Sequence, residues 1–191
     1  MDIILSICVG IGLSAACGFR VFIPPLIMSI ASLSGHLTLS QNFAWMGTYP
    51  ALIAFAVAAS LEVGAYYVPW LDHLLDSIAS PAAIIAGTIV TASLITDMSP
   101  FLKWTLALIA GGGAAAAIQS LTVLTRGASL VGTGGLANPV VSTAELGGSI
   151  LTSALALVIP VFTVLVILAL LLVAGSKILA KRAEQQVQIS P

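Results

Sequence analysis

Charged side chains are scarce in this sequence, and the scarcity limits what the protein can be. Among 191 residues there are six Lys or Arg and seven Asp or Glu, which gives a formal net charge of −1. The chain has no basic patch of the kind that binds nucleic acid, so we expect no nucleic-acid partner.

Cysteine is nearly absent as well. Cys8 and Cys17 are nine residues apart, and at about 100° per residue they face opposite sides of a helix. We therefore expect no disulfide between them, and cysteine usage leaves the redox compartment open.

Motifs for catalysis and nucleotide binding are missing too. The glycine-rich run 132–135 lacks the Lys-Ser/Thr pair and the preceding strand of a P-loop. No nucleophile has a base and an orienting acid at a usable spacing. Asp72, His73 and Asp76 could offer metal ligands, but a solvated helix face is the favoured interpretation, because His73 lies next to Asp72 rather than four residues away and a helix at the membrane surface exposes such residues in any case. We expect no enzyme, no cofactor and no resident metal.

Apolar residues, by contrast, are abundant. The chain is 59% hydrophobic, with a mean hydropathy of +1.15. Several stretches approach the roughly 20 apolar residues that a spanning helix needs, and the alternation with period two of a barrel is absent. The sequence predicts an all-α transmembrane bundle of about five to six spans, with one membrane domain over residues 1–176 and a basic tail over 177–191.

Glycine, proline and hydroxyl residues divide the apolar sequence. The expected elements are a helix over 3–19 that is broken near 18–25 and resumes over 26–33, a helix over 50–68, a surface helix over 70–79, helices over 81–96 and 100–126, and a helix over 139–175 kinked at Pro160. Residues 3–34 could form one broken span or a hairpin. A second broken or re-entrant region is expected over 127–149, where Asn138 is the expected helix cap.

Basic residues indicate the orientation. Lys177, Lys181 and Arg182 predict a cytoplasmic C-terminus, and Lys103 should share that side if the fourth and fifth helices are antiparallel neighbours. The surface helix and the loop at 126–138 would then face outward.

One polar stripe runs through an otherwise apolar helix. Ser142, Glu145, Ser149 and Thr152 fall within an arc of roughly 80° at helical spacing. Such a stripe should face the bundle interior or a wet cavity. Two interpretations stay open, a functional site and a seam of structural hydrogen bonds between helices.

Four charged residues fall inside apolar stretches, namely Arg20, Glu62, Arg126 and Glu145. Burial of an unpaired charge costs roughly 2.5–3.5 kcal/mol, so at least one contact between an arginine and a glutamate is expected within the bundle. Helix breaks near polar residues are typical of transporter sites. Pairing of the two breaks would build a central site from Ser14, Arg20, Asn138, Ser142 and Glu145. The full candidate set is Ser14, Arg20, Glu62, Arg126, Asn138, Ser142, Glu145 and Ser149.

Motifs in fixed order across nearly the whole chain resemble one known family. They are Gly12-Leu13-Ser14-Ala15-Ala16-Cys17-Gly18-Phe19-Arg20, Phe43-Ala44-Trp45-Met46-Gly47, Pro69-Trp70-Leu71-Asp72-His73, and Asn138-Pro139-Val140-Val141-Ser142-Thr143-Ala144-Glu145. Together they resemble the bacterial membrane family catalogued as domain of unknown function (DUF) 4126. The resemblance implies a small membrane domain and no established activity. Members tend to carry a second acid after the equivalent of Glu145, where this chain has Leu146.

Two functions from different classes follow. The first is a transporter or channel-like binder of a small polar or ionic solute in a bacterial inner membrane. The second is a non-catalytic subunit or scaffold that packs against a larger complex or lipid. That subunit would use the small-residue stripe Gly10, Ser14, Gly18 and the glycines 111–113 as contact faces, which could also join two copies of the chain. An intramembrane enzyme is a weaker third hypothesis.

Overall fold

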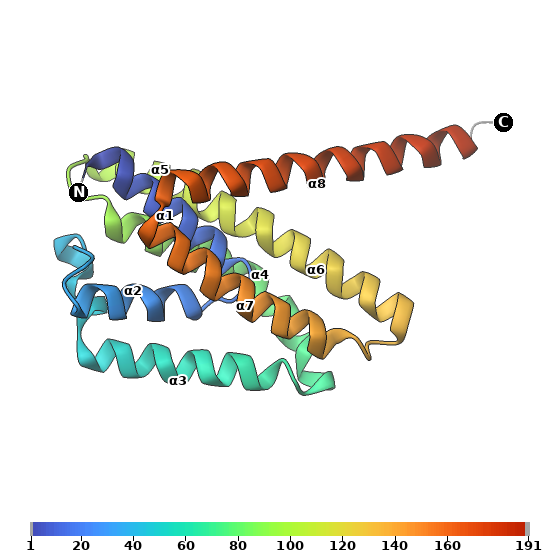
Figure 1. The fold of residues 1–191 in the computed structure, drawn as a ribbon, viewed down its shortest axis with the longest axis horizontal. Coiled ribbons are helices and arrows are strands. Elements are labelled where there is room, and N and C mark those ends of the chain that lie inside the picture. Colours follow the sequence, from blue (N-terminus) through green and yellow to red (C-terminus); the bar gives the residue numbers. More distant parts are fainter. Residues whose placement is uncertain (1, 190–191) are drawn as a thin grey trace.

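The computed structural model describes the backbone of residues 2–189, and the side chains of that range except those of 69–74, 76 and 178–189. All regular elements in the described range are helical (Figure 1). They are α1 (Ile3–Cys17), α2 (Ile23–Leu33), the 3-10 helix η1 (Gln41–Gly47), α3 (Tyr49–Ala65), α4 (Pro69–Leu94), α5 (Pro100–Leu106), the π-helix η2 (Ala107–Gly112), α6 (Gly113–Thr133), α7 (Asn138–Val158) and α8 (Pro160–Ile189).

The predicted helical membrane bundle is confirmed. Within residues 2–189, four helical segments are long and apolar enough to cross a membrane, or five if η1 and α3, bent by 66° at a short break, count as one span. The four segments are Ser77–Leu94, Pro100–Thr133, Asn138–Val158 and Pro160–Lys177. Cys8 and Cys17 are free thiols, as expected from their spacing.

The first two helices form a hairpin that enters the bundle and returns. α1 has 15 residues and α2 has 11, so at 1.5 Å per residue they are about 22 and 16 Å long. Both are shorter than a hydrocarbon core of about 30 Å. Figure 1 shows α1 running inward from the N-terminal end and α2 running back to the same end. The hairpin alternative for residues 3–34 is therefore the one adopted.

The predicted break in this region is confirmed, but the prolines do not make it. Pro24 and Pro25 lie in the first turn of α2, where the missing amide hydrogens would have no helical acceptor in any case. The break lies between Cys17 and Ile23, after a final turn in which Arg20 N donates to Ala16 O at 3.2 Å. The hairpin tip is therefore residues 18–22.

The surface helix over 70–79 and the helix expected from Pro81 are one helix. α4 runs from Pro69 to Leu94 with Pro81 inside it. A proline removes a single amide donor from the ladder, and the buried Ala79 and Ala83 on either side pack into the bundle. The separation predicted at this proline was wrong because packing offsets the loss of one hydrogen bond.

The second predicted break is much narrower than residues 127–149. α6 continues through Arg126 to Thr133 and ends at Gly134, whose positive φ of 63° suits a glycine after a helix end. α7 then begins at Asn138, with Ala137 as its cap, and is continuous to Val158. Gly127 and Gly132 cost about 1 kcal/mol each in a helix, which is too little to end α6 even though residues 130–134 are exposed.

Pro160 marks a reversal of the chain, where a kink was expected. α7 ends at Val158 and α8 begins at Pro160, with Ile159 in a non-helical conformation between them. In Figure 1, α7 and α8 lie as separate rods that run in opposite directions. The segment over 139–175 is therefore two crossings, and residues 139–149 of the expected re-entrant region belong to the first of them.

This extra crossing changes the predicted orientation. α6 and α8 run in the same direction, so Lys103 and the C-terminal end of α8 lie at opposite ends of the bundle (Figure 1). The α3–α4 connection and the loop between α6 and α7 lie at the end where α8 finishes, so they share the side of the basic tail. The sequence predicted Lys103 on the side of the basic tail, and the α3–α4 connection and the α6–α7 loop on the opposite side. Both predictions were wrong, because α7 and α8 were counted as one helix.

The small-residue stripe of α1 is buried inside the chain. A Cβ added to Gly10 would lie 3.1 Å from Thr91 Cα, and one added to Gly18 would lie 2.6 Å from a backbone oxygen of α6. Ser14 Oγ donates to Gly87 O at 2.6 Å. The stripe therefore lets α4 and α6 approach α1 closely.

Replacement of Gly12 by alanine is expected to destabilise the fold. The new Cβ would lie 2.6 Å from the Cβ of Ala156, and overpacking of this kind costs about 1–3 kcal/mol. The matched control is Gly147→Ala, whose Cβ meets no described atom within 4 Å. Thermal unfolding in detergent should show a lower Tm for Gly12→Ala alone. Equal Tm values for the two variants would show that α1 and α7 are not in tight contact.

Candidate functional site

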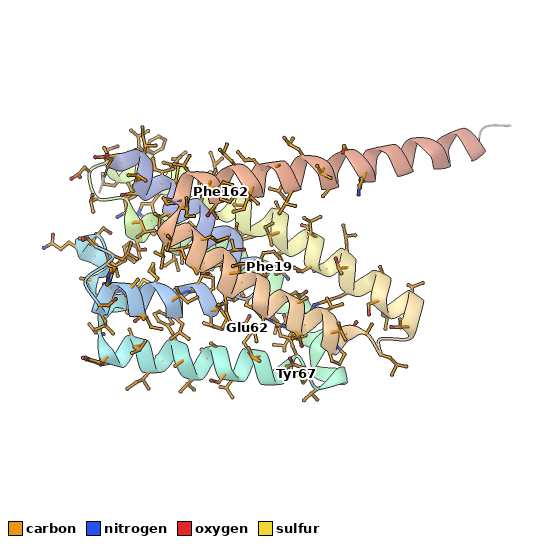
Figure 2. The ribbon with its side chains drawn as sticks, in the orientation of Figure 1. Phe19, Glu62, Tyr67 and Phe162 are labelled. Atoms are coloured by element: carbon orange, nitrogen blue, oxygen red, sulfur yellow. The ribbon has the colours of Figure 1, made fainter. Side chains whose placement is uncertain are left out.

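Four charged side chains from four parts of the chain meet inside the bundle. Arg20 comes from the hairpin tip, Glu62 from α3, Arg126 from α6 and Glu145 from α7, and the most exposed of them, Glu62, is only 8% exposed. We call these four residues the charge cluster. Figure 2 shows Glu62 on the side of α3 that faces the hairpin.

Glu145 is the centre of the charge cluster. Arg126 Nε donates to its Oε1 at 2.9 Å, and Arg126 Nη2 donates to its Oε2. The Nη2 of Arg20 lies 3.4 Å from the same Oε2. The expected contact between an arginine and a glutamate is confirmed, and one carboxylate neutralises part of two guanidinium groups.

Arg20 is also held by the start of α7. Its Nη2 donates to Ser142 O at 2.9 Å and to Ser142 Oγ. Its Nε and Nη1 are buried and have no hydrogen-bond acceptor among the residues that the structure describes. A side chain that is 1% exposed thus retains two donor groups that no described residue satisfies.

Glu62 has a different partner from the one its charge suggests. Its Oε1 accepts from Val21 N at 2.7 Å, and its Oε2 accepts from Phe22 N at 3.0 Å. These amides open α2, where the helix dipole favours a negative charge. Two backbone donors at this helix end are therefore already occupied by this carboxylate.

Tyr66 is a member of the site that sequence reasoning missed. The guanidinium carbons of Arg20 and Arg126 lie 4.0 and 4.1 Å from the centroid of its ring. Cation–π contacts of this kind contribute about 0.5–2 kcal/mol each. The available signal was spacing, because Tyr66 follows Glu62 by four residues and so lies on the same face of α3.

The predicted serines divide between the charge cluster and the helix seams. Ser142 binds Arg20, as described above. Ser149 Oγ donates to Ala16 O at 3.0 Å and joins α7 to α1. Ser14 hydrogen-bonds to Gly87 and to Thr91 of α4, so its hydroxyl is used in a seam and not at the cluster. The polar stripe of α7 therefore contains both a cluster element and a structural seam.

Asn138 lies at the end of the bundle that carries the loop between α6 and α7. It is the first residue of α7, one turn before Ser142, and is partly buried. Tyr67 and Thr143 share a hydrogen bond of 2.9 Å between their hydroxyls, which ties the residues just after α3 to α7. This end of the site is thus held by polar contacts between α3 and α7.

The weak metal candidates cannot be placed. The side chains of Asp72, His73 and Asp76 lie outside the described residues. Among the residues whose side chains are described, no three His, Cys, Asp or Glu gather closely enough to hold a metal ion.

An apolar pocket lies beside the charge cluster. It has a volume of about 340 Å³ and is lined by Glu62, Tyr66 and apolar side chains of the hairpin tip, α3 and α4. A neighbouring pocket of about 330 Å³ also has Val21 and Phe22 in its wall. Arg20 and Glu145 are not among the lining residues of either pocket, so on this side the cluster is covered by Glu62 and Tyr66.

The fold and the site define an all-helical integral membrane protein that keeps two arginines and two glutamates within its bundle, beside the tip of a short helical hairpin. Within that class, the chain belongs to the family described as domain of unknown function (DUF4126), which it matches over residues 7–179. No curated protein and no solved structure matches the chain.

Proposed function

We propose that this protein binds a small polar or ionic solute at the charge cluster and moves it across the membrane. The observation that carries the proposal is the ion pair between Arg20, at the tip of a hairpin inside the bundle, and Glu145 of α7. Interrupted helices that end beside polar groups within the membrane recur in the substrate sites of transporters.

Stability alone is a poor reason to keep four charges in such a place. Desolvation of buried ions is costly, and well-packed apolar residues of similar volume are often as stabilising or more so. Ionisable residues within membrane segments are therefore functional candidates by default. The two donors of Arg20 that lack a described acceptor add to this argument, since a purely structural pair would gain by satisfying them.

Solute flux into proteoliposomes tests the proposal. Purified protein would be assayed against a panel of cations, anions and neutral metabolites, alongside Glu145→Gln, which removes the charge at the centre of the cluster. The matched control is Asp97→Asn, the same chemical change at an exposed turn. We expect at least one solute whose flux changes several-fold in Glu145→Gln only. Indistinguishable flux for all three proteins across the panel would contradict a transport function.

The side of the membrane is part of the proposal. We infer an inner-type bacterial membrane with the basic tail in the cytoplasm, in line with the excess of Lys and Arg on cytoplasmic flanks. In that orientation the N-terminus and Lys103 face outward. A cysteine introduced next to Lys103 should then react with an impermeant maleimide in intact cells, whereas one introduced next to Lys177 should react only after lysis.

A membrane subunit or scaffold is the second candidate, and α8 favours it. Only 11% of the window Pro160–Lys177 is buried within the chain, against 44% of Ser77–Leu94. Lipid or a partner would cover this surface. The glycine stripe of α1 is not available for the same purpose, because α4 and α6 occupy it. The mass of the particle in nanodiscs would show whether α8 joins copies of the chain.

A further inference from the structure

Arg126 and Glu145 already show how the site would hold an anion. The guanidinium binds the carboxylate through two parallel donors, Nε to Oε1 and Nη2 to Oε2. This fork matches a planar group with two oxygens and is the strongest geometry for binding an oxyanion. The carboxylate of Glu145 thus occupies the position that a free oxyanion would take.

Arg20 supplies further donors to the same position. Its Nη2 is 3.4 Å from Glu145 Oε2, while Nε and Nη1 have no described acceptor. Unmade hydrogen bonds of a buried charged group are costly. A ligand that brings oxygens to this guanidinium would recover that cost, whereas a cation would not.

From this geometry we infer that the solute of the proposed function is a small, planar, monovalent oxyanion that replaces the carboxylate of Glu145 between the two arginines. Glu145 takes up one proton from the aqueous side that supplies the anion and releases it on the opposite side when the anion leaves. The ion pairs between Glu145 and the arginines break, ion pairs between the arginines and the anion form, and no covalent bond changes except the new O–H. The inference rests on the proposed function and names its substrate class.

Charge balance fixes the stoichiometry. The two arginines and two glutamates of the charge cluster sum to zero formal charge. One monovalent anion and one proton leave that sum unchanged, whereas an anion alone would leave an uncompensated charge in a medium of low dielectric constant. The described charged or titratable groups that face Glu145 are Arg20 of the hairpin tip, Arg126 of α6, and Glu62 and Tyr66 at the end of α3. None of them compensates a second negative charge.

Nitrate is a suitable probe, because it is planar and monovalent and does not cross lipid as a neutral acid. Proteoliposomes with a pH dye inside would receive an inward nitrate gradient. We expect nitrate uptake together with acidification of the lumen, and uptake that rises as the external pH falls, by up to about tenfold for each pH unit. The Asp97→Asn protein serves as the matched control and should behave like the wild type.

Two variants separate the roles of the groups. Glu145→Gln mimics the protonated side chain, so nitrate uptake should persist without acidification and without pH dependence. Arg126→Lys keeps the charge but loses the fork, so the nitrate concentration for half-maximal uptake should rise about tenfold or more while pH dependence remains. If Glu145→Gln fails to fold, the wild-type acidification and the Arg126→Lys shift still decide the inference.

The outcomes also distinguish this inference from the proposed transport function on which it rests. Flux of a cation or a neutral solute without nitrate flux would overturn the oxyanion site and leave a transport function in place. Nitrate flux without acidification in the wild type would overturn the role of Glu145 as proton acceptor. Absence of flux for every solute in the panel would overturn both proposals.

Discussion

Replacement of Glu145 by leucine is expected to lower the free energy of unfolding by about 3–5 kcal/mol, because it strands two buried cations that share one carboxylate. Arg126 would lose the acceptors of both donors of its fork. Arg20 would keep Ser142 and lose its contact of 3.4 Å with the carboxylate. Chemical unfolding in mixed micelles measures the change.

A double variant shows whether this loss comes from the ion pair. Arg126→Met with Glu145→Leu removes both the fork and its acceptor, leaving apolar side chains of similar length. We expect it to recover much of the stability, with a coupling energy of about 2 kcal/mol or more between the two positions. Losses that simply add would mean that the pair contributes nothing specific. Glu145→Gln should be milder than Glu145→Leu, because the amide oxygen still accepts from Arg126.

Replacement of Glu62 by leucine is expected to release the tip of the hairpin. Val21 N and Phe22 N donate to its two carboxylate oxygens, and each buried donor left without an acceptor costs about 1–3 kcal/mol. The expected loss is about 2–6 kcal/mol. Glu62→Gln keeps one acceptor oxygen and should lose about half as much.

A thiol label reports where that loss occurs. Cys17 is the last residue of α1 and is fully buried, so in a Cys8→Ala background it should react slowly with a membrane-permeant maleimide. Glu62→Leu should make Cys17 react many-fold faster, and Glu62→Gln less so. A stability loss without faster labelling of Cys17 would place the damage elsewhere than at the hairpin tip.

The opposite roles of the two glutamates follow from what surrounds them. Glu145 faces two side-chain cations, whereas Glu62 faces two backbone amides at the start of α2. One carboxylate is therefore matched to groups that a solute could also bind, and the other fixes the fold of the hairpin. The same residue type thus holds a structural position in α3 and a candidate solute position in α7.

Part of the site could be predicted from residue types alone. A charge in an apolar segment needs a partner, so a contact between an arginine and a glutamate was predictable. Which carboxylate would contact which arginine was not predictable, because the partners come from the hairpin tip, α6 and α7. Ser14 was expected beside Arg20 and instead donates to α4. The separation between Ser14 and the other site residues in the sequence carries no information about which neighbour the Ser14 hydroxyl faces.

The sequence by itself determined that this protein is a helical membrane bundle, because apolar side chains in runs of spanning length have one stable solution in lipid. It also determined that at least one arginine would contact a glutamate within the bundle. Only the tertiary structure decided that α1 and α2 turn back as a hairpin, that the chain reverses at Pro160, and that Tyr66 lies against both arginines. The physical reason is that a break in a helix removes a few hydrogen bonds locally, whereas the direction the chain takes after it depends on which distant surfaces it can pack against.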